Sequence, residues 1–402
     1  MPVLDAITRW PRALPLAASV SLHAAARRGL LGLPGGVRVL DRFDAGLLTP
    51  PASGHRFFGV SYEGGREIEP AVGSASPGDR AWPIAFAADA ESAWRFEDDE
   101  AAPIGLPPAL GPAAPGPIEL GEPASFTGRD AFCRAVERAI AYVHAGDVYQ
   151  VNLTHRLSMP FVGEPRDLFA ALAREAEPAH GFYVELPSGA AVCSVSPELF
   201  LRHDAASRAI STEPMKGTRP ATGDAAELFG AAKDRAELAM IVDLMRNDLG
   251  RTAAFGSVCV DVPRKVELHG NAVHQATATI SAKLRDELLF GDALVAAFPP
   301  GSVTGAPKIR AMQIIDELEP VRRHLYCGTL GVIDASGDAS CSVAIRTALV
   351  SPPNAEGVRT VDYHVGCGIV ADSDPEAEWQ ESLDKAEVLR RVVQRSRAKV
   401  MA

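Results

Sequence analysis

Helical and strand-like segments follow one another in an irregular order along the 402-residue chain, and this order limits the possible folds. Apolar residues recur at helical spacing over 129–145, and the next segment, 148–157, alternates like a strand. Further helices are predicted over 224–249, 306–318 and 375–394. Strands are predicted over 258–268, 276–284, 328–334, 341–350 and 360–365. Since strands and helices alternate regularly in a Rossmann fold or a TIM barrel, the sequence argues against both.

A proline-rich stretch over 101–124 marks the clearest boundary, with seven prolines among its 24 residues. Proline lacks the backbone N–H and breaks helices, so this stretch predicts an extended connector. We expect the N-terminal region, 1–100, to contribute strands to the same fold as the main domain, 125–395. The run Phe57–Tyr62 looks like one such strand.

Charge and cysteine content exclude several classes of protein. The formal net charge is −11, which argues against a main role on nucleic acid or on an anionic membrane. The six cysteines form no Cys-x-x-Cys pair, and this favours a reduced, cytoplasmic protein with incidental thiols. No segment approaches the ~20 apolar residues of a membrane span.

Two predicted helices each carry a pair of acids three residues apart. The pairs are Asp234 with Glu237 and Glu378 with Glu381. This spacing puts both carboxylates of a pair on one helix face, and carboxylates on two facing helices would suit Mg²⁺. Spacing alone favours the simpler interpretation of two solvated acidic faces.

Several single residues could carry chemistry, although each also has a plain structural interpretation. Lys216 lies on a turn between two prolines and could be a nucleophile or simply solvated. Glu198 could be a general acid, and Arg346 could hold a carboxylate or lie on the surface. A lone histidine such as His274 is more often structural. The Gly/Pro turn over 298–308 runs into a helix and predicts either an anion site beside Lys308 or an ordinary helix cap.

Taken together and in this order, the segments resemble those of the chorismate-utilising enzymes. That family includes anthranilate, aminodeoxychorismate, isochorismate and salicylate synthases. The resemblance covers about 125–395 and rests on these strings: GDVYQVNLT (146–154), SPELF (196–200), EPMKGTRP (213–220), KDRAELAMIVDLMRNDLGR (233–251), FPPGSVTGAPKIRAMQIIDELEP (298–320), YCGTLG (326–331), AIRT (344–347) and GCGIVADSDPEAEWQESLDKA (366–386). It implies an α+β fold, with two large antiparallel β-sheets packed across each other and helices outside.

Two positions discriminate among the branches of this family. Water-adding members have a lysine base where this chain has Gln150, and a glutamine cannot deprotonate water. Aminodeoxychorismate synthases carry a lysine where anthranilate synthases have alanine, and this chain has Lys216. The resemblance therefore implies amination of chorismate to 4-amino-4-deoxychorismate, in the para-aminobenzoate branch of folate biosynthesis. Anthranilate synthase component I is the alternative.

The resemblance also implies roles for individual residues. Glu237 and Glu381 would bind Mg²⁺ directly, with Asp234 and Glu378 acting through water. Lys216 would attack chorismate with Glu198 as the acid, His274 would lie against the ring, and ammonia would come from a glutamine amidotransferase subunit. The expected substrate-binding residues are Thr218, Ser302, Tyr326, Arg346, Gly368 and Lys385.

Overall fold

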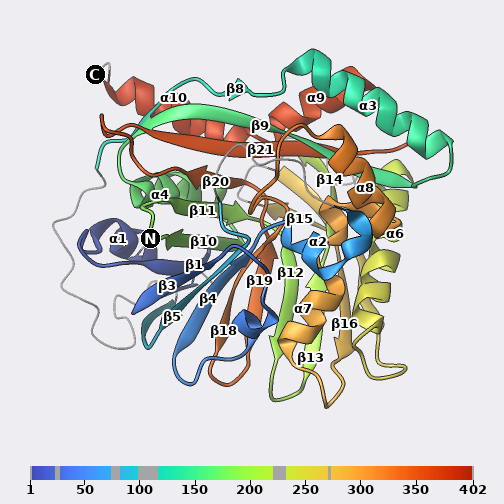
Figure 1. The fold of residues 1–402 in the computed structure, drawn as a ribbon, viewed down its shortest axis with the longest axis horizontal. Coiled ribbons are helices and arrows are strands. Elements are labelled where there is room, and N and C mark those ends of the chain that lie inside the picture. Colours follow the sequence, from blue (N-terminus) through green and yellow to red (C-terminus); the bar gives the residue numbers. More distant parts are fainter. Residues whose placement is uncertain are drawn as a thin grey trace.

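The fold is that of a computed structural model, which describes residues 2–22, 28–73, 82–97, 116–220, 232–269 and 273–400. Two large antiparallel sheets face each other, and helices cover their outer sides (Figure 1). This is the α+β architecture that the family resemblance implied. The first fifteen residues of the connector, 101–115, lie outside the described ranges, while its last part forms the short strands β7 (Glu119–Leu120) and β8 (Ala124–Ser125).

The first sheet has eleven strands among the described residues. Its main path runs in the order β17 (Gly305–Ala306), β9 (Gln150–Val162), β21 (Arg359–Ile369), β20 (Thr347–Val350), β11 (Ala191–Ser196), β10 (His180–Glu185), β1 (Ala17–Ser21), β2 (Arg28–Leu33) and β6 (Ser92–Glu97), and β7 and β8 pair with β9. The long strands β9 and β21 pair from Val151 opposite Ile369 to Phe161 opposite Arg359. This ladder brings the beginning of β9 next to the end of β21.

The second sheet has ten strands among the described residues. Its path runs β14 (Met215–Pro220), β16 (Val273–Lys283), β13 (Ala209–Glu213), β12 (Leu199–Asp204), β19 (Ala339–Val343), β18 (Thr329–Asp334), β4 (His55–Val60), β5 (Ala85–Ala90) and β3 (Gly36–Leu40), and β15 (Cys259–His269) pairs with β16. Strand β4 lies between β5 and β18, with Val60 opposite Thr329. The N-terminal strands β4, β5 and β3 therefore form one end of this sheet, with β3 at its edge.

Apolar side chains from both sheets meet in the space between them. Phe182 of β10 packs against Phe57 of β4, with ring centroids 6.2 Å apart, and against Phe86 of β5 at 6.3 Å. All three rings are almost fully buried. Since burying a phenylalanine contributes about 1.5–3 kcal/mol, these contacts hold the two sheets together.

Helices cover the outer faces of the sheets. They are α1 (Pro2–Arg9), α2 (Gly64–Ile68), α3 (Arg129–His144), α4 (Pro165–Ala176), α6 (Ala232–Gly250), α7 (Phe290–Ala297), α8 (Lys308–Leu318), α9 (Pro375–Asp384) and α10 (Glu387–Val400), with single 3₁₀ turns η1 (Ala45–Leu48), η2 (Pro70–Val72) and η3 (Gly301–Val303). Helices α3 and α9 lie side by side along β9 and β21, and α6 packs on β14, β15 and β16 (Figure 1). Within the described ranges, no helix combines the length and apolar character that crossing a bilayer requires.

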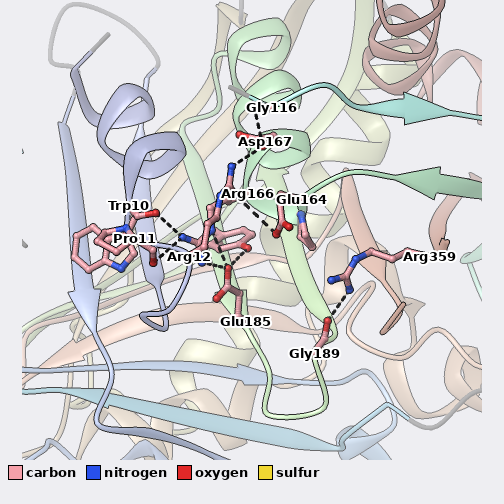
Figure 2. A network of polar contacts seen from close by, with 12 residues as sticks. Trp10, Pro11, Arg12, Gly116, Glu164, Arg166, Asp167, Glu185, Gly189 and Arg359 are labelled. Carbon is pink, nitrogen blue, oxygen red and sulfur yellow. Dashed lines mark hydrogen bonds and ion pairs between the residues drawn. The ribbon is translucent and has the colours of Figure 1, made fainter. Parts of the chain in front are cut away.

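A buried network ties the N-terminal segment to α4. Arg166 donates to the carbonyl of Trp10 at 3.0 Å and to Oε1 of Glu185 at 3.0 Å from its Nε (Figure 2). Arg12 donates to Asp167 at 2.9 Å. Arg166 is 2% exposed, so its charge needs these partners, and the network fixes the N-terminal segment against the first sheet.

Two predicted elements were wrong in their extent. The strand predicted over 341–350 is two strands, β19 and β20, which belong to different sheets, because Arg346 has a φ of 50° that a strand cannot accommodate. The closing helix predicted over 375–394 is divided at Lys385 and Ala386 into α9 and α10. The break redirects the chain so that Leu389 packs into the core outside the first sheet.

Candidate active site

The two sheets bring Gln150, Lys216 and Gly368 together at the point where β9 begins and β21 ends. A Cβ atom placed on Gly368 would lie 1.9 Å from Nε2 of Gln150 and 3.2 Å from Nζ of Lys216. Gln150 and Gly368 belong to the first sheet and Lys216 to the second. The Gln150 amide and the Lys216 amine therefore both lie at the space that a side chain on Gly368 would occupy.

A β-bulge in β14 aims Lys216 into this space. Lys216 lies opposite Ala276 of β16 and Thr218 opposite Gln275, so Gly217 is the extra residue. Its φ of 78° is a conformation that glycine adopts without strain. Burial lowers the pKa of the Lys216 amine, and the Glu237 carboxylate opposes that shift. The amine is therefore closer to its neutral, nucleophilic form than an exposed lysine.

Glu198 lies beside this lysine, just before β12. It is 3% exposed, and burial raises the pKa of its carboxyl to about 7, while the Ser302 hydroxyl and the Lys216 ammonium favour the charged form. Near neutral pH a large fraction of Glu198 thus carries a proton. A protonated acid next to an amine of lowered pKa is the combination that covalent catalysis with a leaving hydroxyl requires.

Ser302 reaches Glu198 from the turn between α7 and α8. A hydrogen bond joins the Ser302 hydroxyl to the Glu198 carboxyl, so this turn does contribute to the site. Of the two interpretations of this turn, the structure does not favour an anion site that uses Lys308. Its ammonium donates to Asp248 and to the Ala297 carbonyl, both at 2.6 Å, and is engaged in a nearly buried ion pair instead of an open anion site.

The predicted metal ligands come from α6 and α9. The negative charges of Glu237 and Glu381 both raise the pKa of the Lys216 ammonium. Helices α6 and α9 therefore each direct one carboxylate toward the space around Lys216. Glu381 pairs with Lys385 at 2.9 Å, and Ser373 donates to Glu378 at 2.6 Å. Among the described residues, no three His, Cys, Asp or Glu side chains are grouped closely enough to hold an ion together.

The donor chemistry of these helices nevertheless suits one ion. Mg²⁺ is commonly held by one or two carboxylates and keeps several waters, so it does not need a cage of three protein ligands. Glu237 and Glu381 supply such a pair, and the Glu381 side chain is 55% exposed. Asp234 lies one turn before Glu237, and its negative charge opposes the lowering by burial of the pKa of Arg264 in β15.

Three further predicted residues, Arg346, Tyr326 and Lys385, are largely buried or engaged near these elements. Arg346 lies between β19 and β20; burial lowers the pKa of its guanidinium, with Tyr363 and Glu198 opposing the shift. Tyr326 is almost fully buried, and its ring stacks on His364 with centroids 5.3 Å apart. Lys385 donates to the Gly366 carbonyl at 2.8 Å and lowers the pKa of Lys216, which places its charge near the same space.

His274 and Thr218 lie on the same pair of strands as Lys216. His274 is two residues from Ala276 on β16, and Ala276 lies opposite Lys216. Since alternate residues of a strand share a face, His274 is on the face that carries Lys216. The backbone of Thr218 follows the bulge, and its side chain lies outside the described part of the structure.

A buried ion pair that the motifs did not reveal holds the site's walls in place. Arg323 binds Glu319 at 2.6 Å and donates to the carbonyls of Val303 and Asn152 at 2.9 and 2.6 Å. Glu319 also accepts from the Thr154 amide at 2.8 Å. This pair therefore links the Ser302 turn to β9. The sequence feature that could have indicated this ion pair is the i,i+4 spacing of Glu319 and Arg323 within DELEPVRR.

The chain belongs to the chorismate binding enzyme family, whose sequence pattern matches residues 57–391. The aminodeoxychorismate synthase component 1 of Escherichia coli (strain K12) is 45% identical over 251 residues, which are 61% of this chain and 53% of that protein. An anthranilate synthase component 1 of Haloarcula marismortui is 41% identical over 287 residues, covering 68% and 56%. The chain spans about half the length of the curated relatives it matches.

A solved structure has the same fold. The crystal structure of anthranilate synthase component I from Streptococcus pneumoniae TIGR4 aligns with a TM-score of 0.74 and 26% identity, covering 92% of this chain and 91% of that one. The family and the fold implied by the sequence motifs are thus confirmed. The relatives carry the names of two different synthases.

Proposed function

We propose that this chain aminates chorismate with ammonia to give 4-amino-4-deoxychorismate. The observation that carries the proposal is that the Lys216 amine and the Gln150 amide both border the side-chain-free position at Gly368, with the protonatable Glu198 close enough to interact with the lysine. The names of relatives such as the Escherichia coli protein support the same reaction.

The proposed chemistry uses the ionisation of these groups. The neutral Lys216 Nζ forms a bond to C2 of chorismate, both conjugated ring double bonds shift by one position, and the C4 hydroxyl leaves as water with the proton of Glu198. Ammonia then bonds to C4, both double bonds shift back, Lys216 leaves C2 as the neutral amine, and the new ammonium returns a proton to Glu198. Gln150 has no basic group, so water is not activated at this position. Arg346 and Lys385 supply positive charge for the substrate carboxylates.

A metal ion and a partner subunit belong to the same proposal. Mg²⁺, held by Glu237 and Glu381 with Asp234 and Glu378 acting through water, would neutralise a substrate carboxylate. Ammonia would come from a glutamine amidotransferase subunit, as the designation "component 1" of the relatives suggests. The metal is supported by the family resemblance and by the carboxylates directed at Lys216, and the partner subunit by the family resemblance and the relatives' designation.

Product analysis tests the proposed reaction directly. The protein is incubated with chorismate, Mg²⁺ and ammonium, and the products are separated and identified by mass. We expect aminodeoxychorismate, which yields para-aminobenzoate only after a lyase is added. Consumption of chorismate to isochorismate, or no consumption with ammonium present, contradicts the proposal.

Anthranilate synthesis is the second candidate, because relatives at 41% and 39% identity bear that name. It starts from the same substrate and aminates a different ring carbon. Anthranilate is fluorescent and forms without a lyase, so its direct appearance would favour this candidate. A lysine at position 216, where anthranilate synthases resemble one another in having alanine, supports the first candidate instead.

A further inference from the structure

His155 is buried on the outer face of the first sheet, beneath α9. Its ring stacks on Trp379 of α9 with centroids 4.6 Å apart and an interplanar angle of 25°. Nε2 lies 2.8 Å from the Ser382 hydroxyl oxygen, and Nδ1 lies 3.1 Å from that of Ser125. The residue is fully buried, so both ring nitrogens depend on these two partners.

The neighbouring hydrogen bonds determine which ring nitrogen carries the proton. Ser382 donates its hydroxyl hydrogen to the Trp379 carbonyl at 2.7 Å, so it accepts from His155 Nε2. The Gly128 amide donates to Ser125 Oγ at 3.1 Å, which leaves the Ser125 hydroxyl free to donate to Nδ1. One neutral tautomer thus completes a chain of four hydrogen bonds from the beginning of α3 to α9.

The neutral form agrees with the surroundings of the ring. Burial lowers the pKa of His155 to about 4, so the imidazole is uncharged throughout the physiological range. Phe132 of α3 contributes a second aromatic contact, edge to face, with centroids 5.0 Å apart. The ring is therefore held by aromatic contacts as well as by both hydrogen bonds.

Helix geometry connects this contact to the candidate active site. Trp379 and Ser382 are three residues apart and share one stripe of α9, while Glu378, Glu381 and Lys385 form the adjacent stripe. A helix turns by 100° per residue, so fixing the first stripe against β9 also fixes the direction of the second. The Cys367 thiol, which donates to the Glu378 carbonyl at 3.3 Å, holds the same turn of the helix.

We propose that His155 is a positioning residue, which sets the rotation of α9 and so presents Glu381 and Lys385 to the active site. The contact itself is independent of the reaction, whereas its effect on turnover rests on the function proposed above. The chemistry needed at position 155 is one N–H donor toward α9 and one acceptor toward Ser125.

Hydrogen exchange measured by mass spectrometry tests the structural part on the full chain. His155→Leu removes both polar atoms and keeps an apolar side chain, while His155→Gln restores an amide donor near Nε2. We expect amides of 375–386 to exchange about tenfold faster in His155→Leu, as for one lost buried hydrogen bond, and near the wild-type rate in His155→Gln. Ser125→Ala is the matched control, because it breaks the chain on the α3 side only.

Ser382→Ala covers the case in which His155→Leu does not fold, because it removes the acceptor from the α9 side. The proposal is overturned if α9 exchanges as in wild type in the folded variants, or if α4, which lies elsewhere on the sheet, accelerates equally. Added Mg²⁺ should slow exchange of α9 in wild type and in His155→Gln, and much less in His155→Leu.

Kinetics then distinguish positioning from general stability. In His155→Leu the Mg²⁺ concentration for half-maximal turnover should rise about tenfold, with His155→Gln close to wild type. Unchanged Mg²⁺ dependence despite a loosened α9 would overturn the positioning role. If wild type does not consume chorismate at all, the proposed function fails, while the exchange experiment still decides how α9 is held.

Discussion

Replacing Gly368 by alanine is the most direct test of the site geometry. The added Cβ would lie 1.9 Å from Nε2 and 3.0 Å from Cδ of Gln150. Carbon and nitrogen atoms normally stay about 3.5 Å apart, so the amide must move by about 1.5 Å. Gln150 is 1% exposed, so its amide can move only within a filled space, and Lys216 Nζ already lies 3.2 Å from the added Cβ.

The expected cost falls mainly on catalysis. Misplacing a positioned group by about 1 Å can reduce a rate 10²-fold, whereas one extra methyl in a packed region costs about 1–3 kcal/mol of stability. Gly368→Ala should therefore fold and melt cooperatively, with chorismate turnover at least about 10²-fold below wild type. The assay is steady-state consumption of chorismate with ammonium and Mg²⁺, alongside thermal unfolding followed by circular dichroism.

Two variants make this result interpretable. Gly36→Ala in β3 is the matched control, because a Cβ there meets nothing within 4 Å. The double variant Gln150→Ala/Gly368→Ala removes the atoms that the new methyl would strike, so the alanine at 368 should cost much less in that background. Full activity of Gly368→Ala, or an equal penalty with and without the Gln150 side chain, would refute the geometry described here.

Four other perturbations address individual roles. Lys216→Ala should slow amination about 10²-fold or more, and intact-protein mass spectrometry with chorismate and Mg²⁺ but no ammonia should find an adduct on wild type alone; an adduct on another residue contradicts this role. Gln150→Lys should increase water addition at C2, measured as isochorismate by chromatography, and an unchanged product ratio argues against it. Glu237→Ala and Glu381→Ala should keep the wild-type circular dichroism spectrum and lose Mg²⁺-dependent turnover, whereas a wild-type rate undiminished by EDTA would exclude the metal. Because the acid form of Glu198 is lost as pH rises through its pKa of about 7, kcat/KM should fall above that pH in wild type and be low and level in Glu198→Gln; a wild-type profile without this fall contradicts the acid role.

The sequence predicted the parts of the site that lie in compact motifs. Lys216 stands between Pro214 and Gly217, and the acids on α6 and α9 repeat an i,i+3 spacing; these local strings made both candidates, and the family resemblance then gave them roles. The bulge at Gly217 and the helix start at Pro375 follow from the chain's own backbone preferences. Such features need no knowledge of distant neighbours.

Features that depend on distant partners could not be predicted in the same way. Lys308 looked like an anion ligand because its buried partner, Asp248, lies 60 residues earlier. In the sequence, His155 is only one residue of an alternating strand. Its hydrogen-bond partners could not be predicted, because Ser125 comes 30 residues before it and Ser382 comes 227 residues after it. One strand was predicted over 341–350, and the sequence did not indicate that the chain changes sheets at Arg346.

The place of β4 in the second sheet has a consequence for biosynthesis. Its edge toward β18 is completed only when Val60 meets Thr329, about 270 residues later in the chain. At about 5–20 residues per second, a ribosome needs about 15 to 50 s to reach that partner. Through this interval the apolar segment around Phe57 and Phe58 lies on a strand that has β5 on one side and an unpaired edge on the other, which favours aggregation. Yield in a cell should therefore depend on chaperones that bind nascent chains more strongly than on the stability of the finished protein.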